Sequence, residues 1–144
     1  MKILLYYVGK ARDAAANAMA QEFIKRTTRY ANCEMREIVP ARFDPWSKHP
    51  TATRVLLDPA GQTMDSERFA KLVGRAEFEA RDLVFLVGGA SGLPDDWRAQ
   101  AARSGTDLLL SLSAMTMPHE LARALLAEQI YRAFTILRGH PYPK

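Results

Sequence analysis

Short apolar runs, closed by Gly, Pro, Asp or Ser, recur along the chain. Nearly continuous runs occupy Lys2–Val8, Arg54–Leu57, Leu83–Val87 and Leu108–Leu110, and Cys33–Val39 alternates apolar with polar residues. Runs of this length predict β-strands, and an uninterrupted run is typical of a central parallel strand that is buried on both faces. The pattern therefore predicts five strands.

Between the predicted strands, apolar residues recur three and four positions apart, which is the spacing of an amphipathic helix. Asp13 is placed to cap the first such helix, Asp65 or Ser66 the second, and Pro94 begins the third. Strands that alternate with helices predict an α/β fold with a parallel sheet. A chain of this length predicts a single domain over residues 1–144.

The longest helical pattern, Pro118–Leu137, is apolar around almost its whole circumference. Its polar positions form a narrow strip that contains Arg123, Glu128, Arg132 and Arg138. A helix of this kind must be covered on more than one side, and in so small a domain we expect another subunit to supply the second cover. Most soluble homo-oligomers are two-fold dimers, so the pattern predicts a homodimer that packs through this helix.

The segment Pro40–Thr51 is rich in residues that interrupt regular structure. It contains three prolines, and its composition predicts an irregular loop with no helix in it. Trp46 lies in this segment and Trp97 in the third predicted helix, and both are expected to be packing or surface residues.

Three segments that follow predicted strands should lie at one edge of a parallel sheet. They are Leu57–Gly61, Gly88–Gly92 and Leu112–Met117. Open α/β folds bind ligands in the crevice at this edge. Gly-Gly-Ala-Ser-Gly at 88–92 matches neither a dinucleotide fingerprint nor a P-loop, and a plain strand-to-helix turn explains it equally well. Small side chains, apolar walls and the lack of a phosphate-binding lysine favour an adenine-like ligand over a triphosphate.

Charge is distributed unevenly, although the net charge of the 144 residues is only +4. Residues 1–50 carry nine Lys and Arg against five Asp and Glu, and residues 118–144 carry four against two. The middle of the chain is slightly acidic. Basic ends fit a polyanionic partner, and a solvated surface explains them equally well.

Composition also bears on the compartment and on metal binding. Cys33 is the only cysteine, which excludes an internal disulfide and a cysteine-based zinc site, and we expect it to be a small buried residue. No apolar run approaches the roughly 18 residues of a membrane span, and the N-terminus lacks the pattern of a signal peptide. The sequence therefore predicts a cytoplasmic protein that binds neither membrane nor metal.

Histidines stand at both ends of the last predicted helix. The positive end of a helix favours the neutral imidazole, so His119 is a candidate proton acceptor, and a local capping or packing role stays open. His140 belongs to the tail Arg138–Lys144, in which Tyr142 and the basic side chains suit stacking on a base and pairing with phosphate. A frayed terminus is the alternative.

Four motifs, in order and at suitable spacing, resemble one protein family. They are Phe-Leu-Val-Gly-Gly-Ala-Ser-Gly-Leu (85–93), Leu-Ser-Leu-Ser-Ala-Met-Thr-Met-Pro-His (110–119), Ala-Glu-Gln-Ile-Tyr-Arg-Ala (127–133) and Arg-Gly-His-Pro-Tyr (138–142). The chain resembles the methyltransferases that act on N3 of a pseudouridine in large-subunit (23S) ribosomal RNA, a family of the SPOUT superfamily. The resemblance is specific over residues 83–144 and looser, though collinear, from Lys2.

This resemblance implies a fold, a cofactor and partners. The fold is a SPOUT-type α/β domain whose parallel sheet carries a deep trefoil knot toward the C-terminus, an exception to the rule that chains are unknotted. The methyl donor is S-adenosyl-L-methionine (SAM), no metal is needed, and the enzyme is a homodimer. The substrate is a pseudouridine of 23S ribosomal RNA in the assembled ribosome.

The resemblance also assigns the binding of SAM, position by position. The implied contacts are Leu57, Gly88, Leu112, Ser113, Ala114, Met115, Thr116 and Met117. The tail is implied to complete the site against the partner subunit's cleft. Arg132, Arg138 and Tyr142 are then expected to bind the substrate, through charge-assisted contacts and stacking.

Methyl transfer to N3 requires a group that removes the N3 proton. His119, His140 and Glu128 are the candidates for this base within the motifs, and the sequence does not choose among them.

Two rival functions stay open at this point. One is a knotted methyltransferase that acts on another RNA, such as a tRNA, and the tail motif argues against it. The other is a ribosome-binding factor without catalysis, which would have no need of an intact loop 112–117 beside Gly88. The family's usual helix between the second and third strands has no counterpart in the predicted loop, which leaves the RNA contact of that helix unassigned.

Overall fold

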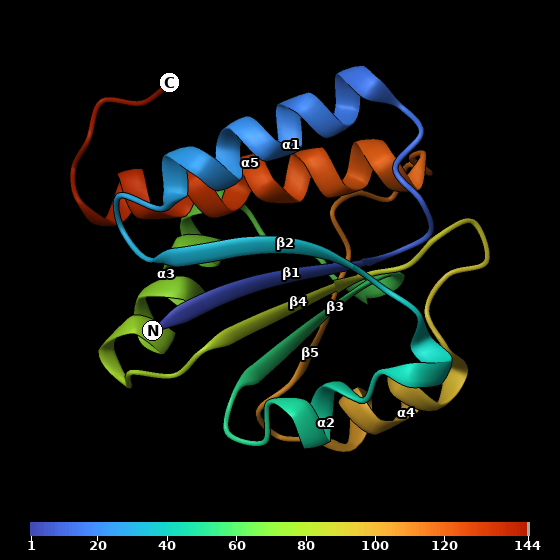
Figure 1. Ribbon diagram of the computed structural model, residues 1–144. Helices are drawn as coiled ribbons and strands as arrows, with labels where there is room; N and C mark the ends of the chain where they lie inside the picture. The colour runs from blue at the N-terminus through green and yellow to red at the C-terminus, as the bar shows by residue number, and fades with distance from the viewer. Residues whose placement is uncertain (144) are drawn as a thin grey trace.

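The computed structural model describes residues 1–143 and contains a five-stranded sheet between two layers of helices (Figure 1). The strands are β1 (Lys2–Val8), β2 (Asn32–Ile38), β3 (Thr53–Gln62), β4 (Leu83–Val87) and β5 (Leu108–Leu110). Their order in the sheet is β2-β1-β4-β3-β5, and every neighbouring pair is parallel. The predicted α/β fold with a parallel sheet is confirmed.

The helices are divided between the two faces of the sheet. They are α1 (Ala14–Thr27), α2 (Pro45–Lys48), α3 (Ser66–Phe78), α4 (Asp95–Arg103) and α5 (His119–Leu137). Helices α1, α3 and α5 pack on one face, and the shorter α2 and α4 lie on the other (Figure 1). Two apolar clusters result, one on each side of the sheet.

Central strand β4 shows why the sheet is buried on both sides. Leu83, Phe85 and Val87 point to the cluster beneath α1, α3 and α5, whereas Val84 and Leu86 point to the cluster beneath α4. All five side chains are buried, as a run of uninterrupted apolar residues predicts for a central parallel strand.

Local capping fixes where the first and third helices begin. The Asp13 carboxylate accepts a hydrogen bond from the amide of Ala16 at 3.0 Å, and the Asp65 carboxylate accepts one from Arg68 at 2.8 Å. Each carboxylate satisfies an amide that the helix itself leaves unpaired. The alternative between Asp65 and Ser66 is thereby decided in favour of Asp65.

The prediction of a helix-free loop over Pro40–Thr51 is wrong. Residues Pro40–Arg42 form a 3₁₀ turn, and α2 follows directly. The Asp44 carboxylate accepts a hydrogen bond from the amide of Trp46 at 2.9 Å, and Pro45 occupies the first helical position, where its missing N–H would have had no partner. The Asp-Pro pair is therefore a helix start here, although prolines interrupt helices elsewhere.

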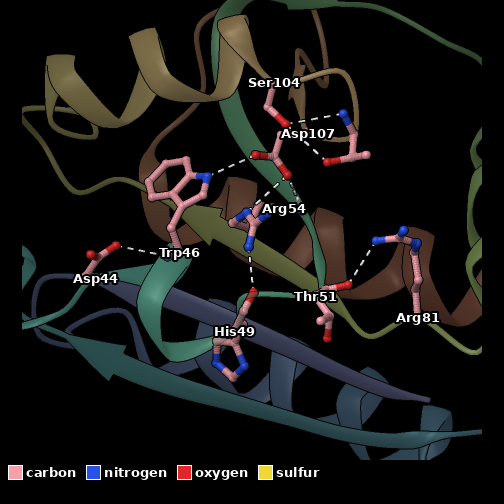
Figure 2. A network of polar contacts seen from close by, with 9 residues as sticks. Asp44, Trp46, His49, Thr51, Arg54, Arg81, Ser104 and Asp107 are labelled. Carbon is pink, nitrogen blue, oxygen red and sulfur yellow. Dashed lines mark hydrogen bonds and ion pairs between the residues drawn. The ribbon is translucent and has the colours of Figure 1, made fainter.

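A buried polar network anchors α2 to the sheet (Figure 2). The Asp107 carboxylate accepts hydrogen bonds from Trp46 Nε1 at 3.0 Å and from the backbone and Nε of Arg54 at 3.0 and 3.1 Å. The Arg54 guanidinium also donates to the carbonyl of His49 at 2.6 Å. The side chains of Arg54 and Asp107 are 6% and 0% exposed, so this ion pair lies inside the protein.

Strand β3 is longer than the predicted Arg54–Leu57. It continues to Gln62, and its pairing with β5 shifts register after Leu57, which is the signature of a bulge. A Cβ atom at Gly61 would lie 2.6 Å from the carbonyl carbon of Leu109, so only glycine allows this close approach. The sequence Asp-Pro-Ala-Gly was interpreted as a stop because bulged strands use the same residues as turns.

Helix α5 finds most of its cover within its own chain. It packs against α1 and α3, and its inner residues Ala124, Ile130 and Phe134 are almost completely buried. The stripe left open includes Leu121 and Ile136, which are 38% and 41% exposed. A second subunit is thus not required to cover most of this helix. The homodimer stays a prediction, because one chain does not test it.

Two remaining expectations are met. Cys33 is buried, and burial raises the pKa of its thiol to about 12, which fits a small packing residue. Trp97 is buried, and its ring packs edge-on against that of Trp46, with ring centroids 6.4 Å apart. No helix within residues 1–143 is long and apolar enough to cross a membrane.

Candidate functional site

A cleft of about 390 Å³ opens at the carboxyl ends of β4 and β5, beside the bulge of β3 that follows Leu57. All three segments that were predicted to meet at this edge contribute to its walls. Of the residues expected there, the lining includes Leu57, Gly88, Leu112, Ser113, Met115, Thr116 and Met117. Ala114 is exposed and is not among the lining residues.

The loop after β4 folds tightly on itself at the cleft wall. A Cβ atom at Gly88 would lie 2.6 Å from the carbonyl carbon of Gly92 and 2.8 Å from the amide nitrogen of Leu93. The amide of Gly92 donates to the carbonyl of Gly89 at 3.0 Å, and Gly92 itself has a φ of +77°, which favours glycine. These glycines let bare backbone form this side of the cleft.

The loop between β5 and α5 is held by two serines. The Ser111 hydroxyl donates to the carbonyl of Ser113 at 3.0 Å, and the Ser113 hydroxyl accepts from the amide of Met115 at 3.0 Å. Within residues 1–143, the amides of Leu112 and Thr116 donate to no other group. The loop therefore presents free backbone donors between apolar side chains, an arrangement that suits a flat heteroaromatic ring.

His119 is the first residue of α5, and it lines the cleft. The sequence predicted a helix that begins at Pro118. In the structure Pro118 is the N-cap residue, and the helix begins one position later. The imidazole therefore lies at the positive end of the helix, next to the backbone loop.

Two charged residues of the cleft were missed by the sequence analysis. The Asp58 side chain is almost fully buried, and its carboxylate pairs with Nη1 of Arg98 at 3.3 Å. Within residues 1–143, Nε of Arg98 is buried and has no hydrogen-bond partner. An acidic residue directly after an apolar run was a usable signal for Asp58. No local pattern distinguishes Arg98 from any surface arginine of a helix.

Glu120, in the first turn of α5, connects the start of this helix to the start of the neighbouring α1. Its carboxylate accepts hydrogen bonds from the amides of Arg12 at 2.6 Å and Asp13 at 3.1 Å and from Asn17 Nδ2 at 2.8 Å. These three donors stabilise the ionised carboxylate and lower its pKa to about 2. The start of α1 and the start of α5 are thereby held together.

Arg123 does not belong to an exposed polar strip, and that part of the prediction is wrong. The residue is completely buried, with its guanidinium carbon 3.7 Å from the ring centroid of Tyr7. Its Nη1 donates to Asn17 Oδ1 at 2.7 Å, whereas Nε and Nη2 have no partner within the described chain. Helical spacing alone could not distinguish this inward-facing arginine from the outward-facing ones.

The residues expected to bind substrate lie at the far end of α5. Arg132, Arg138, His140 and Tyr142 cluster around its last turns, whereas His119 lies at its first. The helix has 19 residues. At the rise of an α-helix it is about 28 Å long. Figure 1 shows the red C-terminal tail at one end of the helix layer and the yellow loop after β4 at the other.

The tail folds back onto α5 through a compact polar cluster. The Tyr142 hydroxyl donates to the Glu128 carboxylate at 2.9 Å, and Arg132 Nη2 donates to the same carboxylate at 2.6 Å. Arg132 Nη1 also donates to the carbonyl of Pro143 at 3.1 Å. Burial, followed by the Glu128 carboxylate, raises the pKa of Tyr142 to about 12. Glu128 thus belongs to the tail cluster and does not line the cleft.

A glycine sets the direction of the tail. Gly139 has a φ of +67°, and the amide of His140 donates back to the carbonyl of Thr135 at 2.9 Å, as in helices that end on a glycine. Arg138 pairs with Glu77 of α3 at 3.0 Å. Lys144, the last residue of the tail motif, lies outside the described residues. In residues 1–143, no group of three or more His, Cys, Asp and Glu side chains is placed to hold a metal ion.

Comparison of the sequence with protein families gives a match over nearly the whole chain. The family described as predicted SPOUT methyltransferase matches residues 1–143. A protein of Solibacter usitatus named ribosomal RNA large subunit methyltransferase H is 61% identical over 142 residues, covering 99% of both chains. A protein of the same name from Sorangium cellulosum is 38% identical over 148 residues, again covering 99% of both chains.

Solved structures share the fold at low sequence identity. A protein of Bacillus anthracis described as an RNA methyltransferase is 13% identical, with a TM-score of 0.55, covering 99% of this chain and 95% of the other. One from Legionella pneumophila, described as a methyltransferase in complex with SAM, is 14% identical, also with a TM-score of 0.55, covering 92% of this chain and 66% of the other. At these identities the likeness concerns the fold alone.

Proposed function

Because the chain belongs to the SPOUT methyltransferase family, we propose that it uses SAM to methylate N3 of a pseudouridine in large-subunit (23S) ribosomal RNA on the assembled ribosome. The names of its relatives at 61% and 38% identity support ribosomal RNA as the substrate. In this proposal residues 1–144 act as one domain in the cytoplasm, and the C-terminal trefoil knot of the superfamily remains a prediction.

The cleft supports SAM as the cofactor. Its volume of about 390 Å³ lies within the range of small-molecule sites. The glycine loop at Gly88 gives close access to backbone, and the free amides of Leu112 and Thr116 offer donors to an adenine ring. Leu57 and Met117 supply apolar walls. Such an arrangement fits a nucleoside that carries no phosphate.

SAM supplies an electrophilic methyl group, so that the N3–C bond forms as the S–C bond breaks. The protein must align N3 with that methyl group and take up the N3 proton, and alignment is expected to supply most of the acceleration. His119 is the candidate base on the cofactor side, and a positioned base adds about 10²–10⁴-fold. His140 is the candidate from the tail, with Arg132, Arg138 and Tyr142 as substrate anchors.

One observation carries the proposal of a shared active site in a homodimer. The amide of His140 bonds to the carbonyl of Thr135, which lies 16 residues along α5 from His119. At the rise of an α-helix this is about 24 Å, too far for His140 to reach a substrate in the cleft of its own chain. An antiparallel second copy would bring its tail to this cleft. A groove of about 350 Å³ between α3 and α5 adjoins the cleft, and its lining combines apolar side chains such as Phe69, Leu112 and Leu125 with a few polar ones. It is suited to receive the partner.

Mixed dimers test the shared site directly. One subunit would carry a cleft substitution, Gly88→Ala, and the other a tail substitution, His140→Ala, with different affinity tags for purification after co-expression. Each mixed dimer has one site with both halves intact. At a SAM concentration below the wild-type Kd we expect about half of the wild-type rate, against about a tenth or less for either homodimer. Mixed dimers as inactive as the two parents would contradict a site built from two subunits.

The substrate is tested separately by mass mapping of modified nucleotides. Ribosomes from a strain that lacks the gene should lose one methylpseudouridine of 23S RNA and regain it when the purified protein and SAM are added. Binding of SAM, measured by calorimetry, separates a methyltransferase from a ribosome-binding factor without catalysis. A methyl group that appears on tRNA instead would favour the rival substrate.

A further inference from the structure

A second concave surface lies at the tail end of the helix layer, away from the cleft. It is a groove of about 570 Å³ between the last turns of α1 and the end of α5. We call it the α1 groove, and its lining consists of Glu22, Lys25, Arg26, Thr28, Arg29, Tyr131 and His140. The proposed methyl transfer makes no use of the α1 side of this groove.

The α1 groove has an excess of positive charge. Arg26 is engaged, because its Nε donates to the Glu22 carboxylate at 2.7 Å and its guanidinium lies over the rings of Phe23 and Tyr131. Lys25 and Arg29 are exposed. Within residues 1–143 neither of them forms an ion pair. Two cations are therefore available to an anion in the groove after its one carboxylate is neutralised.

Aromatic groups stand beside these cations. Tyr131, which is buried, and His140, which is exposed, both line the groove. Tyr142 packs edge-on against Tyr131, with ring centroids 4.7 Å apart. Free cations next to aromatic rings are the combination that proteins use to hold a ribose-phosphate strand and its bases. A binding site for an acidic protein segment would not need the rings.

The position of the groove determines which part of an RNA could occupy it. His140 lines the α1 groove and also belongs to the tail, so the groove lies beside the tail. In the proposed dimer the groove therefore lies next to the cleft that the tail completes. We propose that the α1 groove binds the ribose-phosphate backbone of the RNA beside the target nucleotide, through Lys25 and Arg29. This rests on the proposed function. One subunit then anchors the RNA, and the partner's cleft supplies the methyl group.

Charge reversal tests this role. In Lys25→Glu/Arg29→Glu we expect the KM for ribosomes to rise at least tenfold, with kcat within twofold of wild type and the affinity for SAM unchanged. The matched control, Arg68→Glu/Lys71→Glu on the exposed face of α3, makes the same change in net charge and should leave KM within twofold. Lys25→Gln/Arg29→Gln should give an intermediate KM, and circular dichroism checks that each variant is folded.

Salt dependence provides a readout that a structural effect would not produce. The probe is a fluorescein-labelled RNA stem-loop, whose binding is followed by anisotropy. Loss of two phosphate contacts should reduce the slope of log affinity against log salt by about 1.4. An unchanged slope, or an equal loss of affinity in the α3 control, would overturn the proposal.

Two further outcomes also decide the matter. If charge reversal raises the KM for ribosomes but leaves binding of the stem-loop unchanged, the groove contacts a ribosomal protein and the RNA proposal is wrong. If it lowers kcat at saturating ribosomes with KM unchanged, the residues act on the reaction and not on RNA binding. Because stem-loop binding needs no methyl transfer, failure of the proposed function can be distinguished from failure of the groove.

Discussion

At the scale of single residues, the cleft depends on exposed backbone and on the missing side chain of a glycine. Glycine at position 88 leaves room for the backbone of Gly92, and the loop after β5 offers the free amides of Leu112 and Thr116. The charged exceptions are Asp58 and Arg98, which pair within the cleft wall. Substitutions that add atoms should therefore harm this site more than substitutions that remove charge.

Gly88→Ala tests this view of the cleft. The new methyl group would lie 2.6 Å from the Gly92 carbonyl carbon, so the loop must move away from its present path. We expect the affinity for SAM, measured by calorimetry, to fall at least tenfold, which is about 1.4 kcal/mol. The control is Gly105→Ala, where an added Cβ meets no atom within 4 Å and affinity should be unchanged. Wild-type affinity in Gly88→Ala would remove this loop from the cofactor site.

Residues whose role is set by their chain neighbours were predictable, and those set by tertiary contacts were not. Asp13 caps α1 as expected, because a cap bonds to an amide three positions away. Arg123 was misplaced, because its burial depends on Tyr7 and Asn17, which are more than 100 positions distant in the chain. Arg98 was missed for the same reason: its partner Asp58 comes from another element.

At the scale of elements, polar side chains that reach across the fold fix how helices and strands meet. Glu120 of α5 holds the segment that begins α1, and Asp107 holds α2 and β3 beside β5. The order of strands and helices along the chain could be predicted from apolar periodicity, since that pattern depends only on neighbouring residues. The extension of β3 to Gln62 and the short α2 did not, because bulges and capped turns share their residue types with loops.

The contribution of Glu120 should depend on pH. Its pKa is about 2 in the folded protein. In an unfolded chain it is about 4.3. The stabilisation by the Glu120 carboxylate is therefore fully present above the pKa of the unfolded chain, and it is lost as the pH falls toward the folded pKa of about 2. We expect Glu120→Gln to lower the Tm at pH 6, with the gap to wild type narrowing between pH 4 and pH 2. A gap independent of pH in thermal melts would show that the charge of Glu120 is not what stabilises the fold.

Asp107 should be among the positions most sensitive to substitution. Asp107→Leu leaves the Arg54 guanidinium buried without its partner, and breaking a buried pair in this way costs about 3–5 kcal/mol. The double variant Arg54→Met/Asp107→Leu removes both charges and should recover much of that loss in urea unfolding. A double variant less stable than Asp107→Leu alone would contradict this account.

At the scale of the whole molecule, the two halves of the expected chemistry lie at opposite ends of α5. The sequence predicted which residues belong to the cleft and which to the tail, because the cleft residues lie in segments that follow predicted strands and the tail is one contiguous motif. It could not predict their separation, which follows from the length and direction of the helix between them. The apolar helix was expected to face a partner broadly, yet Ile130 is fully buried against its own chain. Only its outer stripe remains for another subunit.

Leu125→Glu tests that remaining surface. Leu125 is half-buried and lines the groove beside the cleft, so a carboxylate there would lose its water in an interface. We expect the variant to be monomeric by light scattering and to have less than a tenth of the wild-type turnover. Phe78→Glu, at a side chain that is 91% exposed on α3, is the matched control and should stay dimeric. A fully active Leu125→Glu monomer would contradict both the dimer and the shared site.

The buried ion pair of Arg54 and Asp107 also limits which substitutions this protein can accumulate during evolution. Each residue is buried, and each satisfies the other, so a lineage that loses one of them passes through a poorly folded intermediate. Relatives should therefore carry both charges or neither, and Trp46, which donates to the same carboxylate, should be exchanged along with them. These three positions, which meet only in the folded protein, should thus vary together.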